Sequence, residues 1–263
     1  MRFAKIRTFS MCVGLIFIIL MISTQCYAKI DPKTCVGLWL LDEGNGTTAK
    51  DSSGIGNDGK LTNGPKWVDG KFGKALQFDG VNQYVDCGND ASLDLTKDFT
   101  IVAWINFEDP KHAYDYGQVV ARTDGGGQGG VEFGVCPGTG KLFTTNGPAT
   151  VRSNTALNKD EWYHVTSVYS GNTLTFYVNG EADGGGNITF PTSIERTGIG
   201  RVPSRDLLPY KGIIDDVAVF TEALAQNDIK SIMTKGLSIA LGMTAVFPAS
   251  KLTATWGSIK ARH

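Results

Sequence analysis

The sequence predicts an all-β protein in which two antiparallel sheets pack as a sandwich, followed by one short helix near the C-terminus. Residues 161–181 (EWYHVTSVYSGNTLTFYVNGE) alternate in polarity on both sides of a turn, as the strands of a hairpin do. Residues 99–107 (FTIVAWINF) form an apolar run rich in β-branched and aromatic side chains. Glycine accounts for 33 of the 263 residues, which suits a fold with many tight turns.

The remaining elements follow in chain order. Residues 36–41 (VGLWLL) predict a buried first strand, and residues 131–146 predict a hairpin that turns at 137–140. Residues 212–220 (GIIDDVAVF) predict a final buried strand. Shorter strands are expected at residues 75–78, 84–88, 118–123 and 188–190.

Two local signals define the end of the sandwich. Asn179-Gly180 predicts a type I′ turn, because both residues tolerate a positive φ. Ile229, Ile232 and Met233 recur at helical spacing, which predicts a helix over residues 224–235 that packs by one face. Gly236 is the expected stop of this helix, and residues 236–263 are expected to form a tail.

The N-terminus has the pattern of a secretion signal. Basic residues precede an apolar stretch at 11–22, and the end of residues 1–28 (Cys26-Tyr27-Ala28) approximates a cleavage site. The apolar stretch is shorter than the roughly 20 residues that span a membrane, so no membrane span is expected after cleavage. A secreted or cell-surface protein is therefore predicted, with an uncleaved signal anchor as the alternative.

Charge and cysteine content narrow the function further. Cleavage after Ala28 removes three of the 25 basic residues and leaves 22 against 26 acidic residues, a net charge of −4. No basic patch is visible, so nucleic-acid binding is not expected. The remaining cysteines, Cys35, Cys87 and Cys136, predict one disulfide and one free thiol, and the sequence does not select the pair.

The order of these blocks resembles the laminin G-like (concanavalin A-like) jellyroll family over residues 36–235. The carrying segments are GLWLLDEGNGTTAKDSSGIGNDG, KFGKALQFDG, FTIVAWINF, the hairpin at 161–181 and the closing strand with its helix. The resemblance implies a non-catalytic module that binds an extracellular glycan or a cell-surface protein. A minority of sandwiches of this shape cleave glycans, so fold alone does not decide function.

The resemblance also implies a structural calcium ion, Ca²⁺, which prefers carboxylate, amide and carbonyl oxygens. The expected ligands are Asp51, Asn57, Asp79 and Asp215. One of Asp215 and Asp216 is expected to face inward, where a carboxylate needs a metal or hydrogen-bond donors. The alternative is that these side chains only stabilise turns and strands.

A surface loop offers candidate sugar contacts. Tyr114, Asp115 and Tyr116 lie in a polar segment, and Arg122 ends the strand that follows. Sugars stack on exposed aromatic rings while their hydroxyls pair with polar groups, so these four residues are the predicted ligand-binding set. The alternative is that the tyrosines pack back onto the sandwich.

Catalysis has little support in the sequence. Glycan hydrolysis requires two carboxylates about 5–10 Å apart. The only Glu-x-Asp pair, Glu181 and Asp183, has Gly186 where the sandwich glucanases carry a second Glu, and both side chains are interpreted as solvated loop charges. The alternatives to a binding module are a divergent glycan-cleaving enzyme and an adhesive surface component that uses the tail for attachment.

Overall fold

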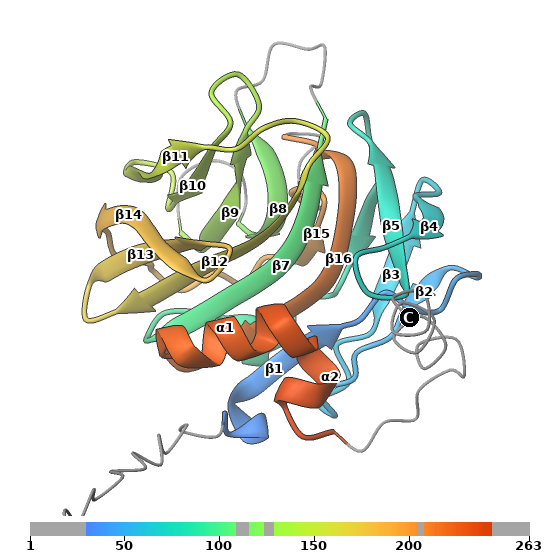
Figure 1. Cartoon of the computed structure of the whole chain (residues 1–263), viewed down its shortest axis with the longest axis horizontal. Coiled ribbons are helices and arrows are strands. Elements are labelled where there is room, and N and C mark those ends of the chain that lie inside the picture. Colours follow the sequence, from blue (N-terminus) through green and yellow to red (C-terminus); the bar gives the residue numbers. More distant parts are fainter. Residues whose placement is uncertain (1–29, 109–115, 124–128, 205–207, 244–263) are drawn as a thin grey trace, which may run out of the picture.

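The computed structural model describes residues 30–108, 116–123, 129–204 and 208–243, and Figure 1 shows their arrangement. The predicted sandwich of antiparallel sheets is confirmed. The predicted signal segment, Tyr114, Asp115 and residues 244–263 of the predicted tail lie outside the described residues.

Two sheets make up the sandwich, and each is built from neighbouring antiparallel strands. Sheet A runs in the order β14 (Glu181–Asn187), β13 (Thr173–Val178), β12 (Trp162–Ser170), β7 (Phe99–Phe107), β16 (Lys211–Phe220), β5 (Lys74–Asp79), β4 (Lys66–Asp69), and β1 (Cys35–Trp39) also pairs with β16. Sheet B runs in the order β2 (Thr48–Ala49), β3 (Gly59–Thr62), β6 (Tyr84–Asp86), β15 (Thr197–Ile199), β8 (Gly117–Arg122), β9 (Val131–Cys136), β10 (Lys141–Thr145), β11 (Thr150–Ala156). A single pairing, Ser153 with Gly184, joins β11 of sheet B to β14 of sheet A.

Strand β7 shows how the sequence determines the two faces of sheet A. Successive strand residues point to opposite faces, so Ile101, Ala103 and Ile105 enter the core between the sheets. Val102 points the other way and joins a second apolar cluster beneath the helices. Both faces of β7 are buried, which explains its nearly continuous apolar run.

The last strand, β16, pairs with two different partners on one side. Its first half, through Ile214, pairs with β5, and its second half, from Val217, pairs with β1. The register against β7 shifts between Asp215 and Ala218, where Asp216 has a positive φ of 46°. This bulge bends the strand so that one strand can pair with both partners.

The predicted helix is confirmed as α1 (Gln226–Lys235), which lies across the outer face of sheet A (Figure 1). Ile229 and Ile232 are buried against that face, as the helical spacing requires. Gly236, with φ of 79°, ends the helix and donates its N–H to the Ile232 carbonyl at 2.8 Å. No helix in the described part of the chain is long and apolar enough to cross a membrane.

The packed domain extends beyond the segment that resembles the family. Ile30 precedes it and is buried in the cluster beneath the helices. A second short helix, α2 (Leu237–Ala240), follows α1, and both Leu237 and Leu241 are buried in the same cluster. The first residues of the predicted tail therefore belong to the folded domain.

The predicted strand at 188–190 is wrong, because the strand in this region is β14, which ends at Asn187. Its sequence, EADGGGN, lacks the apolar and β-branched residues that indicate strands. Gly185 has a φ of 136°, and a Cβ there would collide with the Leu174 carbonyl of the paired strand. The close approach of two backbones requires glycine here. Because glycine is not typical of strands, the sequence pattern does not indicate β14.

The predicted disulfide is also wrong: Cys35, Cys87 and Cys136 are all buried free thiols. Cys35 packs beneath the helices on the outer face of sheet A, whereas Cys87 belongs to the core between the sheets. Burial, with a smaller contribution from the Asp51 charge, raises the pKa of the Cys35 thiol to about 12. Cys35 and Cys87 serve as small apolar side chains in separate parts of the fold.

Candidate functional site

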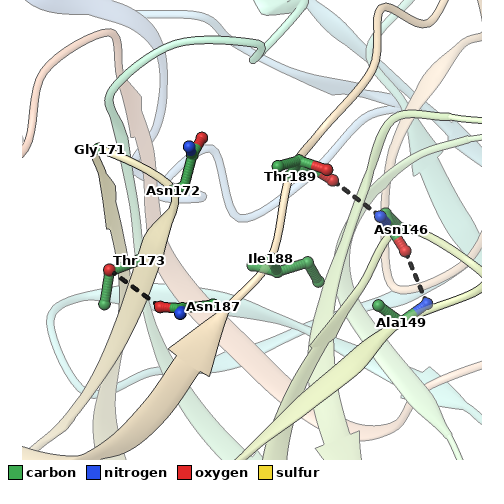
Figure 2. Close-up of a pocket in the computed structure, with 8 residues that line it drawn as sticks. All are labelled: Asn146, Ala149, Gly171, Asn172, Thr173, Asn187, Ile188 and Thr189. Carbon is green, nitrogen blue, oxygen red and sulfur yellow. Dashed lines mark hydrogen bonds between the residues drawn. The ribbon is translucent and has the colours of Figure 1, made fainter.

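Three chain segments meet at one end of the sandwich and border an open pocket of about 540 Å³ (Figure 2). The segments are the β10–β11 turn, the β12–β13 turn and the chain that leaves β14. The volume lies in the usual range of small-molecule sites, roughly 300–1,000 Å³. The pocket is lined by uncharged residues: Asn146, Ala149, Gly171, Asn172, Thr173, Asn187, Ile188 and Thr189.

The β12–β13 turn forms one side of the pocket. Gly171 and Asn172 have positive φ values of 54° and 72°, so they make a two-residue turn of the type that matches strand twist. Asp98 fastens this turn, because its carboxylate accepts hydrogen bonds from the Ser170 hydroxyl at 2.8 Å and the Gly171 N–H at 3.2 Å. The sequence analysis predicts a turn here but no binding role.

The amide groups of Asn172 and Asn187 are oriented by the protein. The Asn172 Oδ1 accepts a hydrogen bond from the Tyr169 hydroxyl at 3.0 Å. The Asn187 Oδ1 accepts one from the Thr173 hydroxyl at 3.3 Å. Both amide oxygens are thus occupied, and neither NH₂ group bonds to any described residue. Each NH₂ group is available to donate to a ligand at the pocket.

Asn146 braces the opposite side. Its Nδ2 donates to the Thr189 carbonyl at 2.8 Å, and its Oδ1 accepts from the Ala149 N–H at 2.8 Å. Figure 2 shows these bonds tying the β10–β11 turn to the segment that follows β14, with Ile188 between the two sides. The Asn146 amide therefore fixes the width of the pocket.

Aromatic side chains support the pocket from below. Phe99, Tyr169 and Phe190 are buried with ring centroids 4.9–5.3 Å apart. Burial, and secondarily the Asp98 charge, raises the pKa of the Tyr169 hydroxyl, so this group stays protonated and keeps donating to Asn172. The packed rings and the hydrogen bonds above them give a preformed site.

Of the predicted ligand-binding set, the structure describes Tyr116 and Arg122, and it does not bring these two residues together. Tyr116 and Arg122 flank opposite ends of β8, about 20 Å apart at the usual rise per strand residue. The Tyr116 ring packs on Phe143 with centroids 4.6 Å apart, and its hydroxyl accepts from Arg152 at 2.9 Å. Of the alternatives weighed for Tyr116, packing against the sandwich is the observed one.

Arg122 has a structural role. It is 4% exposed and donates to the Ser193 carbonyl, the Thr197 hydroxyl and the Asn89 carbonyl at 3.1–3.3 Å. Burial lowers the pKa of its guanidinium, and three nearby acidic residues partly offset that effect. Its donors hold two loops against sheet B rather than point to the pocket.

The predicted calcium ligands Asp51 and Asn57 lie in one loop, which protein donors already organise. The Asp51 carboxylate accepts five hydrogen bonds at 2.8–3.1 Å. Their donors are the N–H groups of Leu38, Ser53, Gly56 and Asn57 and the Ser53 hydroxyl. The Asn57 side chain is buried and donates to the Val36 carbonyl and the Ser92 hydroxyl.

The other two predicted ligands lie elsewhere. Asp79 is exposed at one end of β5 and accepts from the Val81 N–H at 2.8 Å. Asp215 is buried on the helix side of sheet A, beside Trp104 in the register of β7, and accepts from the Phe72 N–H at 2.9 Å. The strand register separates the two by about 13 Å.

These four residues do not fit a single calcium site. Within the described ranges, no three His, Cys, Asp or Glu side chains form a group that could hold a metal ion. Calcium binding stays a prediction from the resemblance, without a ligand set in the described part of the chain.

The pocket residues were missed because no local motif joins them. Asn146, Asn172 and Asn187 are separated by many residues and meet only through the pairing of β11 with β14 and of β13 with β14. One signal in the sequence is the Ser170-Gly171-Asn172 turn, since turns at the ends of strands often carry binding residues.

Comparison with known proteins places the chain in a structural context. The sequence profile of the Laminin_G_3 family, described as the concanavalin A-like lectin/glucanases superfamily, matches residues 79–230. A comparison with curated proteins finds no match. Solved structures at 15–18% sequence identity share the fold.

Domain 4 of an extracellular arabinanase from Geobacillus stearothermophilus, solved with arabinotriose, gives a TM-score of 0.59 at 16% identity. The alignment covers 76% of this chain and 98% of that domain. The binding domain of Paraclostridial Mosquitocidal Protein 1 gives 0.59 at 15% identity, with 77% and 52% covered. Trypanosoma rangeli sialidase gives 0.58 at 17% identity, with 81% and 34% covered, so the chain spans about a third of that enzyme.

Proposed function

Because the chain belongs to the concanavalin A-like lectin/glucanases superfamily, we propose that it is a non-catalytic carbohydrate-binding domain whose ligand enters the pocket between the three turns. The observation that carries this proposal is the pair of oriented amides, Asn172 and Asn187, whose NH₂ groups have no described protein partner.

The chemistry of the pocket suits a sugar. Sugars present many hydroxyl and ring oxygens that accept hydrogen bonds, together with apolar C–H faces. The Asn172 and Asn187 amides supply oriented donors, and the Thr173 and Thr189 side chains add hydroxyls. Ile188 also lines the pocket but is 4% exposed. A few oriented polar groups around apolar surface are the usual composition of a small-ligand site.

The comparisons support the same ligand class. The arabinanase domain was solved with arabinotriose and is covered almost completely by the alignment, so the likeness concerns a whole domain. The sialidase is covered over about a third of its length, so its chemistry is not transferred to this chain. Similarity at this sequence identity supports only the shared fold. The proposal of a sugar ligand rests on the amides of Asn172 and Asn187.

A binding role is preferred to glycan cleavage because the pocket lining contains no carboxylate. Glu181 instead pairs with Lys230 at 2.7 Å and accepts from Gln226. Asp183 accepts from the N–H and hydroxyl of Thr155. Glycoside hydrolysis requires an acid and a second carboxylate flanking the bond. Incubation with labelled oligosaccharides, followed by product analysis, tests the enzyme alternative directly.

The proposed site of action is extracellular, on the basis of the basic and apolar segments within residues 1–28. Expression of the full chain in a secreting host should release a protein that begins at Lys29, as N-terminal mass spectrometry would show. Retention of the full N-terminus in membranes would favour the signal-anchor alternative.

Binding of purified residues 29–263 to an oligosaccharide panel, followed by titration calorimetry, tests the function. We expect Asn187→Ala and Asn172→Gly to weaken binding at least tenfold, which corresponds to about 1.4 kcal/mol. Glycine suits position 172 because the backbone there has a positive φ. The matched control is Asn45→Ala, an exposed asparagine outside the pocket, which should bind as the parent does.

Two results would count against the proposal. If folded protein binds no glycan on the panel, with calcium or with EDTA, weight moves to a cell-surface protein partner or an adhesive role. If Asn187→Ala binds as tightly as the parent, the sugar binds elsewhere on the molecule.

A further inference from the structure

We infer that the pocket selects uncharged sugars and excludes sugars that carry a carboxylate, such as uronic or sialic acids. This inference rests on the proposed function and narrows its ligand class. It follows from the charge of the pocket lining, from the carboxylate that fastens one of its turns, and from the way the two asparagine amides are oriented.

The lining offers no cation to a bound carboxylate. All eight lining residues are uncharged, so a carboxylate that enters loses water without gaining an ammonium or guanidinium partner. The two arginines described above form hydrogen bonds outside the pocket lining. Arg122 holds loops against sheet B, and Arg152 donates to the Tyr116 hydroxyl.

The carboxylate of Asp98 places a negative charge beside the pocket lining. The Asp98 carboxylate bonds to the Gly171 N–H and the Ser170 hydroxyl, so it lies within one hydrogen bond of a lining residue. An acidic sugar in the pocket would place a second carboxylate near it. Like charges brought together at a binding site weaken the wrong ligand more than they affect a neutral one.

The free donors match neutral oxygens. The Asn172 and Asn187 NH₂ groups donate to hydroxyl or ring oxygens, and the Thr173 hydroxyl, which donates to Asn187, can accept from a sugar hydroxyl. A neutral sugar satisfies both donors and acceptors. A carboxylate group only accepts hydrogen bonds, so it can pair with the NH₂ groups but cannot donate to the threonine oxygen as a hydroxyl does.

Pairs of neutral and acidic ligands test the inference. The first pair is methyl-esterified and de-esterified oligogalacturonide, and the second is lactose and sialyllactose; neutral arabino-, xylo- and gluco-oligosaccharides complete the panel. Titrations at low salt should show at least tenfold tighter binding of a neutral member than of its acidic counterpart. Equal or tighter binding of the acidic member, lost in Asn187→Ala, overturns the inference but leaves the carbohydrate-binding proposal standing.

A charge variant tests the role of Asp98. Asp98→Asn should reduce the preference for the neutral member at least threefold, and added salt should reduce the preference of the parent in the same direction. The matched control is Asp183→Asn, because Asp183 also holds an N–H and a hydroxyl of another segment, but lies about 13 Å along β14 from Asn187. An unchanged preference in Asp98→Asn overturns the role of this carboxylate. A folded protein that binds no sugar removes the proposed function itself, and the inference falls with it.

Discussion

His164 is an unusual residue for a buried position on the helix side of sheet A. It lies on β12 opposite Trp104 of β7, with ring centroids 5.3 Å apart, and neither imidazole nitrogen has a hydrogen-bond partner among the described residues. Burial lowers its pKa from 6.5 to about 3. The folded protein therefore holds the imidazole in its neutral form throughout the mildly acidic range.

This pKa predicts an acid-sensitive fold. Below pH 6.5 the unfolded chain binds a proton that the folded chain does not, so His164 reduces stability by up to about 1.4 kcal/mol per pH unit until pH 3. In His164→Phe this contribution should vanish, so chemical denaturation at pH 7 and pH 5 should give a smaller loss of stability than in the parent. An equal loss in His164→Phe and in the parent would mean that other groups dominate the acid response.

The Asp51 carboxylate holds the shape of the loop that follows β1. Five donors converge on it, so Asp51→Ala should lower the free energy of unfolding by about 2–4 kcal/mol, as expected when a network of charge-assisted hydrogen bonds is lost. EDTA should leave the unfolding temperature of the parent unchanged, because protein groups hold this loop. A calcium-dependent rise in unfolding temperature that Asp51→Ala abolishes would instead show that the loop binds the metal.

At the scale of elements, helix α1 is held to sheet A by apolar burial. Ile229 is fully buried, so Ile229→Ala should destabilise the domain by about 2–5 kcal/mol in denaturant titrations. Lys230→Ala on the same helix removes an exposed ion pair with Glu181 and should cost less than about 1 kcal/mol. Comparable losses in the two variants would mean that the polar contact, rather than burial, holds the helix.

Strand prediction succeeded where local pattern and tertiary environment agree. Strand β7 spans the predicted residues 99–107, and α1 falls inside the predicted range, because their apolar residues follow the period of the element. Strand β14 was missed because close backbone approach favours glycine over strand-forming residues. The Asn179-Gly180 turn was found because positive φ at both positions is a local requirement.

For the whole molecule, the three buried thiols make a direct prediction. Native protein of residues 29–263 should react slowly with a thiol reagent, since Cys35, Cys87 and Cys136 are 2–3% exposed. Unfolding in denaturant without reductant should release three reactive thiols. Release of only one reactive thiol would instead support the disulfide that the sequence predicted.

The candidate site was harder to predict than the fold because it depends on long-range pairing. The four predicted calcium ligands and the predicted sugar contacts of the tyrosine loop come from short segments of sequence. In such segments Asp, Asn and Tyr are also the ordinary residues of turns. The pocket depends on which turns the sheets bring to the same end, and no single segment contains that information.

The direction in which the chain enters the domain affects what the pocket can meet. Cys35 is the first residue of β1 and pairs with Phe220 of β16, which in turn pairs with Thr100 of β7. The residue before Thr100, Phe99, pairs with Tyr169 of β12, close to the turn that borders the pocket. Three strand spacings, about 15 Å, therefore separate the entry point from β12. An N-terminal anchor would tether the pocket close to its own membrane and restrict it to glycans of the same surface. Cleavage after Ala28 would release the domain from that membrane, so this processing step would decide whether the proposed glycan ligand must lie on the same cell surface or can lie on another.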